Sequence, residues 1–300
     1  GVTSNSHKAI LNILEACHSA TDGQISAIKA GGAKDDPILE ACPEIQWVSD
    51  NGKASAAFHG GVIGGTAWLF SRADFEDRLD YLFVDEAGQV SVANLAGMSR
   101  STRNIVLIGD QMQLSQPTQG THPGESGLSL LEYLLLDHAV VPEDLGVFLD
   151  CTRRMHPDIC EFISESVYEG RLHADASTVH RTISIAPGEG RLIKVSAGLV
   201  FSPVEHFGNT QSSDEEVARI VEITREILGR PRTDCDGEVA GEITLNDILY
   251  VAPYNMQVRK LSEALPEGAR VGSVDKFQGQ EAAIVIVSMC CSNGEFGTRG

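Results

Sequence analysis

Two short apolar runs, each followed by acidic side chains, indicate what kind of sheet this chain forms. Residues 81–84 (YLFV) lead directly into Asp85 and Glu86, and residues 104–108 (NIVLI) are followed after one glycine by Asp110. Short runs rich in aromatic and branched side chains are typical of strands buried on both faces of a parallel sheet. Open α/β sheets bind their ligands at the carboxyl ends of such strands. The sequence therefore predicts an α/β fold with carboxylates at its ligand-binding edge.

The chemistry that suits these side chains is nucleotide hydrolysis. A buried carboxylate is costly without a partner, and a bound cation provides one. We expect Asp85 to hold Mg²⁺ on the phosphates of ATP, and Glu86 to orient or deprotonate the attacking water. Asp110 would lie on the nucleotide side of the same edge, where Gln113 could contact the γ-phosphate or the water. For Asp85 and Glu86 alone, a solvated acidic turn is the better interpretation; the second strand favours the functional one.

The two strand ends also resemble a known family. DEAGQ (residues 85–89) followed by GDQMQLSQP (residues 109–117) resembles motifs II and III of superfamily 1 helicases. The branch that the chain most resembles contains the nonsense-mediated-decay RNA helicases and the helicase–nucleases of replication. Further blocks follow the family order: VTSNSHKAI (residues 2–10) resembles motif Ia, RMHP (154–157) motif IV, and SVDKFQGQE (273–281) motif V.

The resemblance implies two RecA-like P-loop NTPase domains with mostly parallel sheets. ATP would bind between them, and a single strand of DNA or RNA would lie across them. Residues 1–145 would form the remainder of the first domain, with motifs Ia, II and III. Residues 146–300 would form the second, with motifs IV and V, after a hinge at residues 140–146. The implied activity is an ATP-dependent helicase or translocase that moves 5′ to 3′.

Periodicity and turn residues predict the elements. Helices are expected over residues 7–20, 127–136, 158–168, 213–228 and 258–265. Strands are expected over residues 61–66, 146–150, 191–195, 248–252, 270–274 and 283–289. Residues 21–60 show weak periodicity and are expected to be connecting structure, and residues 229–241 a charged surface loop.

Three residues of the second domain are implied to contact the nucleotide. Arg154 matches the family arginine that crosses to the γ-phosphate, where a planar and permanent charge suits a loose phosphoryl-transfer transition state. The alternative for Arg154 is a surface salt bridge. Gly279 would permit a close approach of the backbone, and Glu281 would lie at the nucleotide edge.

Other residues are implied to contact the nucleic-acid strand. In motif Ia, Thr3, Ser4 and Asn5 suit phosphate and sugar contacts, although an N-capped helix alone would also explain them. Thr66 matches a further strand-contacting threonine. Trp68 could stack on a base, but we expect it in the core.

Motif V and the PYxxQ segment add strand contacts in the second domain. Tyr254 would face the strand, and Gln257 would either bind the strand or fix the loop. Ser273, Asp275 and Lys276 would reach toward the nucleic acid from motif V.

Two blocks of the family pattern do not occur in these 300 residues. The GxxxxGK[ST] loop that cradles phosphates is absent; in the family it precedes motif Ia, and motif VI follows motif V. We therefore expect the chain to be a fragment, with a first domain that lacks its Walker A strand and loop, and to be inactive on its own. Some members of the branch carry a nuclease domain upstream, which the full-length chain could share.

Composition bears on nucleic-acid binding, on membrane association and on the cellular compartment. A net charge of −19 argues against a general nucleic-acid binder but permits a local strand-binding groove. No run is long enough to span a membrane, and no signal peptide is visible. The seven cysteines have no paired spacing, which suggests reduced thiols in the cytoplasm.

Two rival functions belong to other classes. A non-catalytic nucleic-acid-binding scaffold on a degenerate helicase core predicts loss of the hydrolytic residues, yet Asp85, Glu86, Gln113 and Arg154 are all present. A P-loop NTPase without unwinding activity would not need the blocks that resemble motifs Ia, IV and V.

Overall fold

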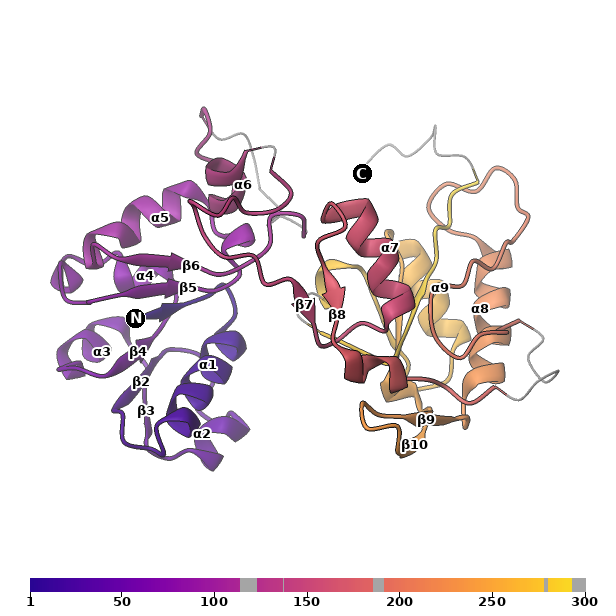
Figure 1. Ribbon diagram of the computed structural model, residues 1–300, viewed down its shortest axis with the longest axis horizontal. Coiled ribbons are helices and arrows are strands. Elements are labelled where there is room, and N and C mark those ends of the chain that lie inside the picture. The colour runs from indigo at the N-terminus through magenta and orange to yellow at the C-terminus, as the bar shows by residue number, and fades with distance from the viewer. Residues whose placement is uncertain (114–122, 137, 186–191, 278–279, 293–300) are drawn as a thin grey trace. The chain divides into compact units, whose positions relative to one another are not determined.

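The chain divides into two units, shown in Figure 1. The structure, a computed structural model, describes residues 1–113, 123–136, 138–185, 192–277 and 280–292. Unit 1 comprises residues 1–148 and unit 2 residues 149–300. The sequence predicted a division after residue 145. Each unit has its own core, and each is built around a parallel sheet.

Unit 1 contains a six-stranded parallel sheet in the order β3-β2-β4-β1-β5-β6, which confirms the predicted α/β class. The strands are β1 (Val2–Thr3), β2 (Ala27–Ala30), β3 (Ile45–Val48), β4 (Val62–Gly64), β5 (Leu82–Val84) and β6 (Ile105–Leu107). The helices are α1 (His7–Ala20), α2 (Pro37–Ala41), α3 (Asn51–Ala57), α4 (Ala67–Phe70), α5 (Val92–Met98) and α6 (Leu130–Leu135), with 3-10 turns η1 (Ala73–Phe75), η2 (Ala87–Gln89) and η3 (Ser99–Ser101).

Helix α1 forms over the residues that its pattern predicts. Ser6 caps the helix by accepting a hydrogen bond from the Ala9 amide at 3.4 Å. Ile10, Leu11 and Leu14 lie on one face and are buried against the sheet. The local signals and the tertiary packing therefore agree in this helix.

The prediction for residues 21–60 was wrong, because this region supplies two strands of the sheet and two helices. The first of these strands, β2, is only four residues long and contains Lys29, which is 1% exposed. The Lys29 ammonium donates to Nδ1 of His7 at 2.9 Å and to the carbonyls of Ala30 and Gly31 at 2.8 and 2.9 Å. With a charged residue among only four, the strand has no apolar pattern by which the sequence would identify it.

Because Lys29 is buried, we expect the free energy of unfolding to rise with pH. Burial lowers the pKa of Lys29 from 10.5 to about 8, and the carboxylate of Asp36 opposes the shift. The unfolded chain therefore binds this proton more tightly than the folded chain. As pH rises from about 8 to 10.5, the folded chain loses its buried charge first, and the free energy of unfolding increases. At about 1.4 kcal/mol per pH unit, we expect at most a gain of about 3 kcal/mol.

Urea unfolding of the wild type and of Lys29→Met, at several pH values between 7.5 and 10.5, measures this gain. The difference between the two free energies of unfolding should shift in favour of the wild type across that window. Other groups that titrate there cancel in the difference. A difference that is independent of pH would contradict the prediction.

The strand β5 is buried on one face and β6 is half-buried on the same face, whereas the sequence predicted burial on both faces. Leu82 and Val84 are fully buried against a cluster that includes residues of α4, α5 and α6. Phe83, Val106 and Ile108 point the other way and are 37–43% exposed. The sequence does not show which residues of these strands are buried, because apolar side chains occupy both faces.

Unit 2 contains a three-stranded parallel sheet in the order β12-β11-β13, a parallel pair β7/β8 and an antiparallel hairpin β9/β10. The strands are β7 (Cys151–Thr152), β8 (His173–Ala174), β9 (Pro231–Thr233), β10 (Val239–Glu242), β11 (Ile248–Val251), β12 (Arg270–Gly272) and β13 (Ile284–Val287). The helices are α7 (Pro157–Val167), α8 (Asp214–Ile227) and α9 (Asn255–Ala264), with 3-10 turns η4 (Ala176–His180), η5 (Leu245–Asp247) and η6 (Asp275–Phe277).

Three predictions in unit 2 were wrong. The strand expected at residues 146–150 begins instead at Cys151. Residues 192–195 form no strand, because the amides of Leu192 and Ile193 donate to the Glu226 carboxylate at 3.0–3.2 Å. The expected loop at residues 229–241 contains the hairpin β9/β10, whose second strand is exposed throughout and so carries no apolar pattern.

In the described parts of the chain, no helix combines the length and the apolar character needed to cross a bilayer.

Candidate nucleotide and nucleic-acid sites

The loop after β5 holds Asp85 and Glu86 at the carboxyl edge of the unit 1 sheet. The Asp85 amide donates to the carbonyl of Thr3 in β1 at 2.8 Å, and the Ala87 amide donates to the carbonyl of Ile108 at 2.9 Å. The loop is therefore tied to the strands on both sides of β5. Burial raises the pKa of the Asp85 carboxyl, and a backbone hydrogen bond from Glu86 opposes the shift.

Glu86 adopts a left-handed backbone conformation with φ +53°. For a residue with a Cβ this costs about 1–2 kcal/mol and persists only where the surroundings impose it. Gln89 Nε2 donates to Oε2 of Glu86 at 3.4 Å. Strain of this kind is concentrated at functional sites, and it occurs here at the residue that the sequence proposes as the base.

The loops after β5 and β6 approach each other closely through two glycines. A Cβ on Gly88 would lie 2.5 Å from the carbonyl oxygen of Asp110, and one on Gly109 would lie 2.7 Å from the Ala87 amide nitrogen. Gln113 Nε2 donates to Oδ2 of Asp110 at 3.0 Å. The structure thus places the four predicted residues, Asp85, Glu86, Asp110 and Gln113, at the ends of two paired strands.

Asp85 suits a Mg²⁺ ligand, because a cation would offset the cost of its half-buried carboxylate. Among the residues described here, no group of three or more histidine, cysteine or acidic side chains gathers as a metal site. A Mg²⁺ ion at Asp85 would therefore depend on nucleotide phosphates for further ligands, as Mg²⁺ commonly does.

In unit 2, the structure brings together two residues that the sequence assigns to the nucleotide. Arg154 Nε lies 2.5 Å from Oε2 of Glu281, and both side chains are about two-thirds exposed. The carbonyl of Arg154 accepts a hydrogen bond from Arg181 at 3.0 Å, and its amide donates to the Thr152 hydroxyl at 3.2 Å. Arg154 therefore does form an ion pair, and its partner is the other predicted nucleotide residue. The predicted Gly279 lies outside the described residues.

The predicted strand contacts of motif Ia need correction. Thr3 and Ser4 are 2% and 3% exposed, because β1 lies between β4 and β5 within the sheet. Their hydroxyls are therefore unavailable to a strand in this conformation. Asn5 is exposed, and its Nδ2 donates to the Gln89 carbonyl at 3.0 Å. Thr66 is half-buried at the start of α4, and its hydroxyl makes no capping hydrogen bond.

Trp68 is 77% exposed, so the expectation that it lies in the core was wrong. Helix α4 has only four residues, and Leu69 and Phe70 fill its core-facing side completely. Trp68 consequently points outward from the first turn of the helix. Helix α4 begins three residues after β4 ends, at the carboxyl edge of the sheet, where Asn5 also follows its strand.

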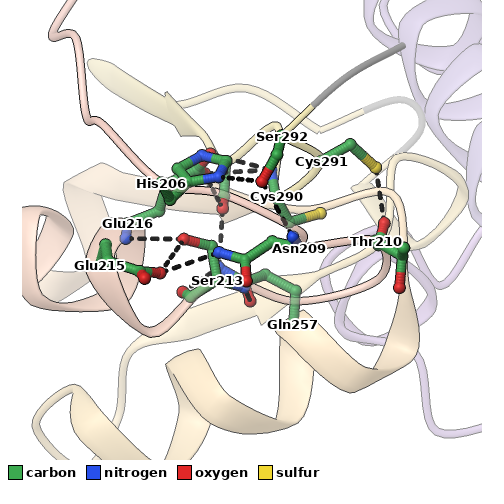
Figure 2. A network of polar contacts seen from close by, with 11 residues as sticks. His206, Asn209, Thr210, Ser213, Glu215, Glu216, Gln257, Cys290, Cys291 and Ser292 are labelled. Carbon is green, nitrogen blue, oxygen red and sulfur yellow. Dashed lines mark hydrogen bonds and ion pairs between the residues drawn. The ribbon is translucent and has the colours of Figure 1, made fainter. Parts of the chain in front are cut away.

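In unit 2, Gln257 fixes a loop and does not face a ligand. It is fully buried, its Oε1 accepts from the Ser213 amide at 2.9 Å, and its Nε2 donates to the Ser213 carbonyl and to the Ser288 hydroxyl (Figure 2). Of the two roles predicted for Gln257, these contacts favour the fixing of the loop over a contact with the strand, because the side-chain amide is already occupied. Tyr254 precedes it and is half-buried.

The motif V residues differ in their accessibility. Ser273 is half-buried, whereas Asp275 and Lys276 are exposed. Lys276 Nζ donates to the Val271 carbonyl at 2.8 Å, so its ammonium folds back onto β12. Lys276 would have to leave that carbonyl in order to reach a phosphate.

The sequence did not predict the network around Glu216 (Figure 2). The Glu216 carboxylate accepts hydrogen bonds from the Ser288 hydroxyl and the Cys290 amide, and it lies 3.0 Å from Nε2 of His206. Nδ1 of His206 in turn contacts the Ser292 hydroxyl at 2.8 Å. These contacts join the first turn of α8 to the end of β13. The only sequence signal was Ser213 three residues before Glu216, which predicts a local capping box.

Residues 127–299 match a family model described as an AAA domain. DNA-binding protein SMUBP-2 of Rattus norvegicus is 30% identical over 239 residues, which cover 74% of this chain and 23% of that protein. DNA polymerase alpha-associated DNA helicase A of Saccharomyces cerevisiae is 26% identical, over 72% of this chain and 34% of that protein.

A third relative is named both a helicase and a nuclease. The DNA replication ATP-dependent helicase/nuclease JHS1 of Arabidopsis thaliana is 26% identical, over 70% of this chain and 16% of that protein. The chain therefore spans between 16% and 34% of the length of these three relatives.

Proposed function

Because this chain belongs to the AAA domain family, in the superfamily 1 helicase branch described above, we propose that the complete protein couples ATP hydrolysis to 5′ to 3′ movement on a single strand of DNA or RNA. The observation that carries the proposal is the arrangement of Asp85, Glu86, Asp110 and Gln113 at the carboxyl ends of two paired strands. The Arg154–Glu281 pair in unit 2 supports it further.

Each of these residues has a proposed role. Asp85 would hold a Mg²⁺ ion, which supplies positive charge to the phosphates when it is bound. Glu86 would take the proton of the attacking water, and Gln113 would orient that water or the γ-phosphate. Arg154 would stabilise the charge that develops on the transferred phosphoryl group, with Glu281 holding the guanidinium before the nucleotide arrives.

The proposal is tested by hydrolysis and unwinding in the complete protein. We expect ATP hydrolysis that single-stranded DNA or RNA stimulates, and unwinding of duplexes with a 5′ overhang but not of those with a 3′ overhang. Strand binding without any hydrolysis would favour the scaffold instead. Stimulated hydrolysis without unwinding would favour an NTPase that does not separate strands.

Two wider properties are proposals as well. A nuclease domain elsewhere in the complete protein is proposed because the Arabidopsis relative is named a helicase/nuclease. A cytoplasmic location is proposed from the scattered spacing of the cysteines.

The 300 residues alone should hydrolyse ATP very slowly. They contain no GxxxxGK[ST] sequence, so backbone amides and a lysine that would cradle the β- and γ-phosphates are not supplied. We expect weak, salt-sensitive binding of single strands as the main activity. Phosphate release from these residues, compared with a longer form that includes such a loop, measures the difference. Rapid hydrolysis by the 300 residues would contradict the prediction.

Trp68 is predicted to stack on a base of the bound strand. The chain has two tryptophans, and Trp47 is half-buried with its indole N–H bonded to the Gly31 carbonyl at 3.2 Å. Binding of oligothymidylate should therefore quench the fluorescence of Trp68 and leave that of Trp47 unchanged. Trp68→Ala should weaken binding by the worth of one stacked base, about 1–3 kcal/mol.

The two tryptophans serve as controls for each other. Quenching should persist in Trp47→Phe and disappear in Trp68→Phe. Equal quenching in both variants, or unchanged affinity in Trp68→Ala, would place the strand elsewhere.

A further inference from the structure

Two hydrogen bonds of Gln89 link a proposed strand contact to the proposed base. The Gln89 carbonyl accepts from Nδ2 of Asn5 at 3.0 Å, across 84 residues of sequence. The Gln89 side chain donates through Nε2 to Oε2 of Glu86 at 3.4 Å. Asn5 is exposed, so a strand can reach it, and Glu86 is half-buried and directly precedes the turn η2.

The turn η2 is fixed on both sides of Gln89. Before it, Ala87 is fully buried and donates to the Ile108 carbonyl. After it, Val90 is 3% exposed, and its carbonyl accepts from the Leu130 amide at 2.8 Å. These contacts restrain the backbone on both sides of Gln89, so a shift at the Gln89 carbonyl moves the whole turn little. The half-buried side chain of Gln89 has more freedom to respond.

The contact between Gln89 and Glu86 is long for a hydrogen bond, since N–H···O distances usually lie at 2.7–3.2 Å. It therefore restrains the Glu86 carboxylate only weakly in this conformation. A general base must lie within about 2.6–3.2 Å of the group that it deprotonates, so a small change in its orientation has a large effect on the rate. A closer Gln89 amide would hold the carboxylate in one orientation.

We propose that Gln89 is a positioning residue through which a strand bound at Asn5 orients the Glu86 carboxylate, so that nucleic acid accelerates ATP hydrolysis. The inference rests on the proposed function and names the route by which the strand site influences the hydrolytic site. The route is physical and short: one side chain, one backbone carbonyl and one side-chain amide.

Gln89→Ala in the complete protein tests the route. The variant keeps the carbonyl that Asn5 binds and removes only the amide that contacts Glu86. We expect the ratio of turnover with saturating oligothymidylate to turnover without it to fall to about 1, within the roughly twofold error of such comparisons. The Kd for the oligonucleotide and the KM for ATP should stay within about twofold of the wild type.

Asn5→Ala removes the other end of the route and should also lower the ratio, measured at saturating oligonucleotide. If both residues act in one chain of contacts, the double variant should show no larger loss than either single variant, because coupled residues are not additive.

Gln111→Ala is the matched control. Its amide donates to the carbonyls of His138 and Ala139, at 2.7 Å each. Its ratio should equal that of the wild type, whatever its basal rate.

Two results would show that Gln89 does not transmit the effect of the strand: a wild-type stimulation ratio in Gln89→Ala, or losses that multiply in the double variant. A parallel fall in stimulation ratio, strand affinity and melting temperature would show a merely structural role and would also overturn the inference. A wild type whose hydrolysis no strand stimulates would instead refute the proposed function. The two failures are therefore distinguishable.

Discussion

Glu86→Gln is expected to lower the turnover of ATP hydrolysis by roughly 10²–10⁴ in the complete protein, the usual worth of a general base. Glutamine has the shape of glutamate, so the left-handed turn at this position and the adjacent Asp85 should be retained. The carboxamide cannot accept the proton of the attacking water. ATP-dependent strand binding should therefore survive while hydrolysis is lost.

Glu76→Gln is the control for loss of one negative charge in the same unit. Glu76 is exposed and pairs with Arg100 at 2.9 Å, away from the proposed site. Its variant should hydrolyse ATP at the wild-type rate. Near-normal turnover in Glu86→Gln would remove Glu86 from the role of base.

Arg154→Ala is expected to lower hydrolysis by roughly 10³–10⁵, as for other arginines that stabilise phosphoryl transfer. The loss should come from the chemical step and not from unfolding. Arg154 is 66% exposed, and its ion pair with Glu281 lies at the surface, where such pairs contribute about 0–1 kcal/mol. Strand affinity measured without nucleotide should be largely unchanged.

Arg153→Ala separates this role from a general effect of charge. Arg153 adjoins Arg154, is 87% exposed and lies 3.7 Å from Asp175. Its replacement should leave hydrolysis close to the wild-type rate. If Arg154→Ala affected only nucleic-acid binding, Arg154 would belong to the strand site.

Several elements could be predicted from the sequence because their signals are local. The helix at residues 7–20 has a serine cap and apolar side chains at helical spacing, and the structure has α1 over those residues. The strand at residues 248–252 is a continuous apolar run, and β11 is buried at every position. The acidic residues after β5 and β6 were assigned to one edge because parallel neighbouring strands end at the same side of a sheet.

Other elements could not be predicted, because the pattern that defines them is short or mixed. Strand β2 contains the buried Lys29, whose ammonium donates to His7, a residue that only the fold brings close. Trp68 was expected in the core because it is large and apolar, but α4 is too short to bury a third such side chain beside Leu69 and Phe70.

The α/β class, the order of the motifs and the positions of the acidic residues after their strands follow from the residues alone. The partners of several buried polar groups depend on contacts between segments that are distant in the chain. Ser213 and Glu216 have the spacing of a capping box, yet Gln257, 44 residues from Ser213, accepts from the Ser213 amide. Glu216 binds the Cys290 amide instead. Local and distant acceptors offer similar hydrogen bonds, so proximity in the folded chain selects between them.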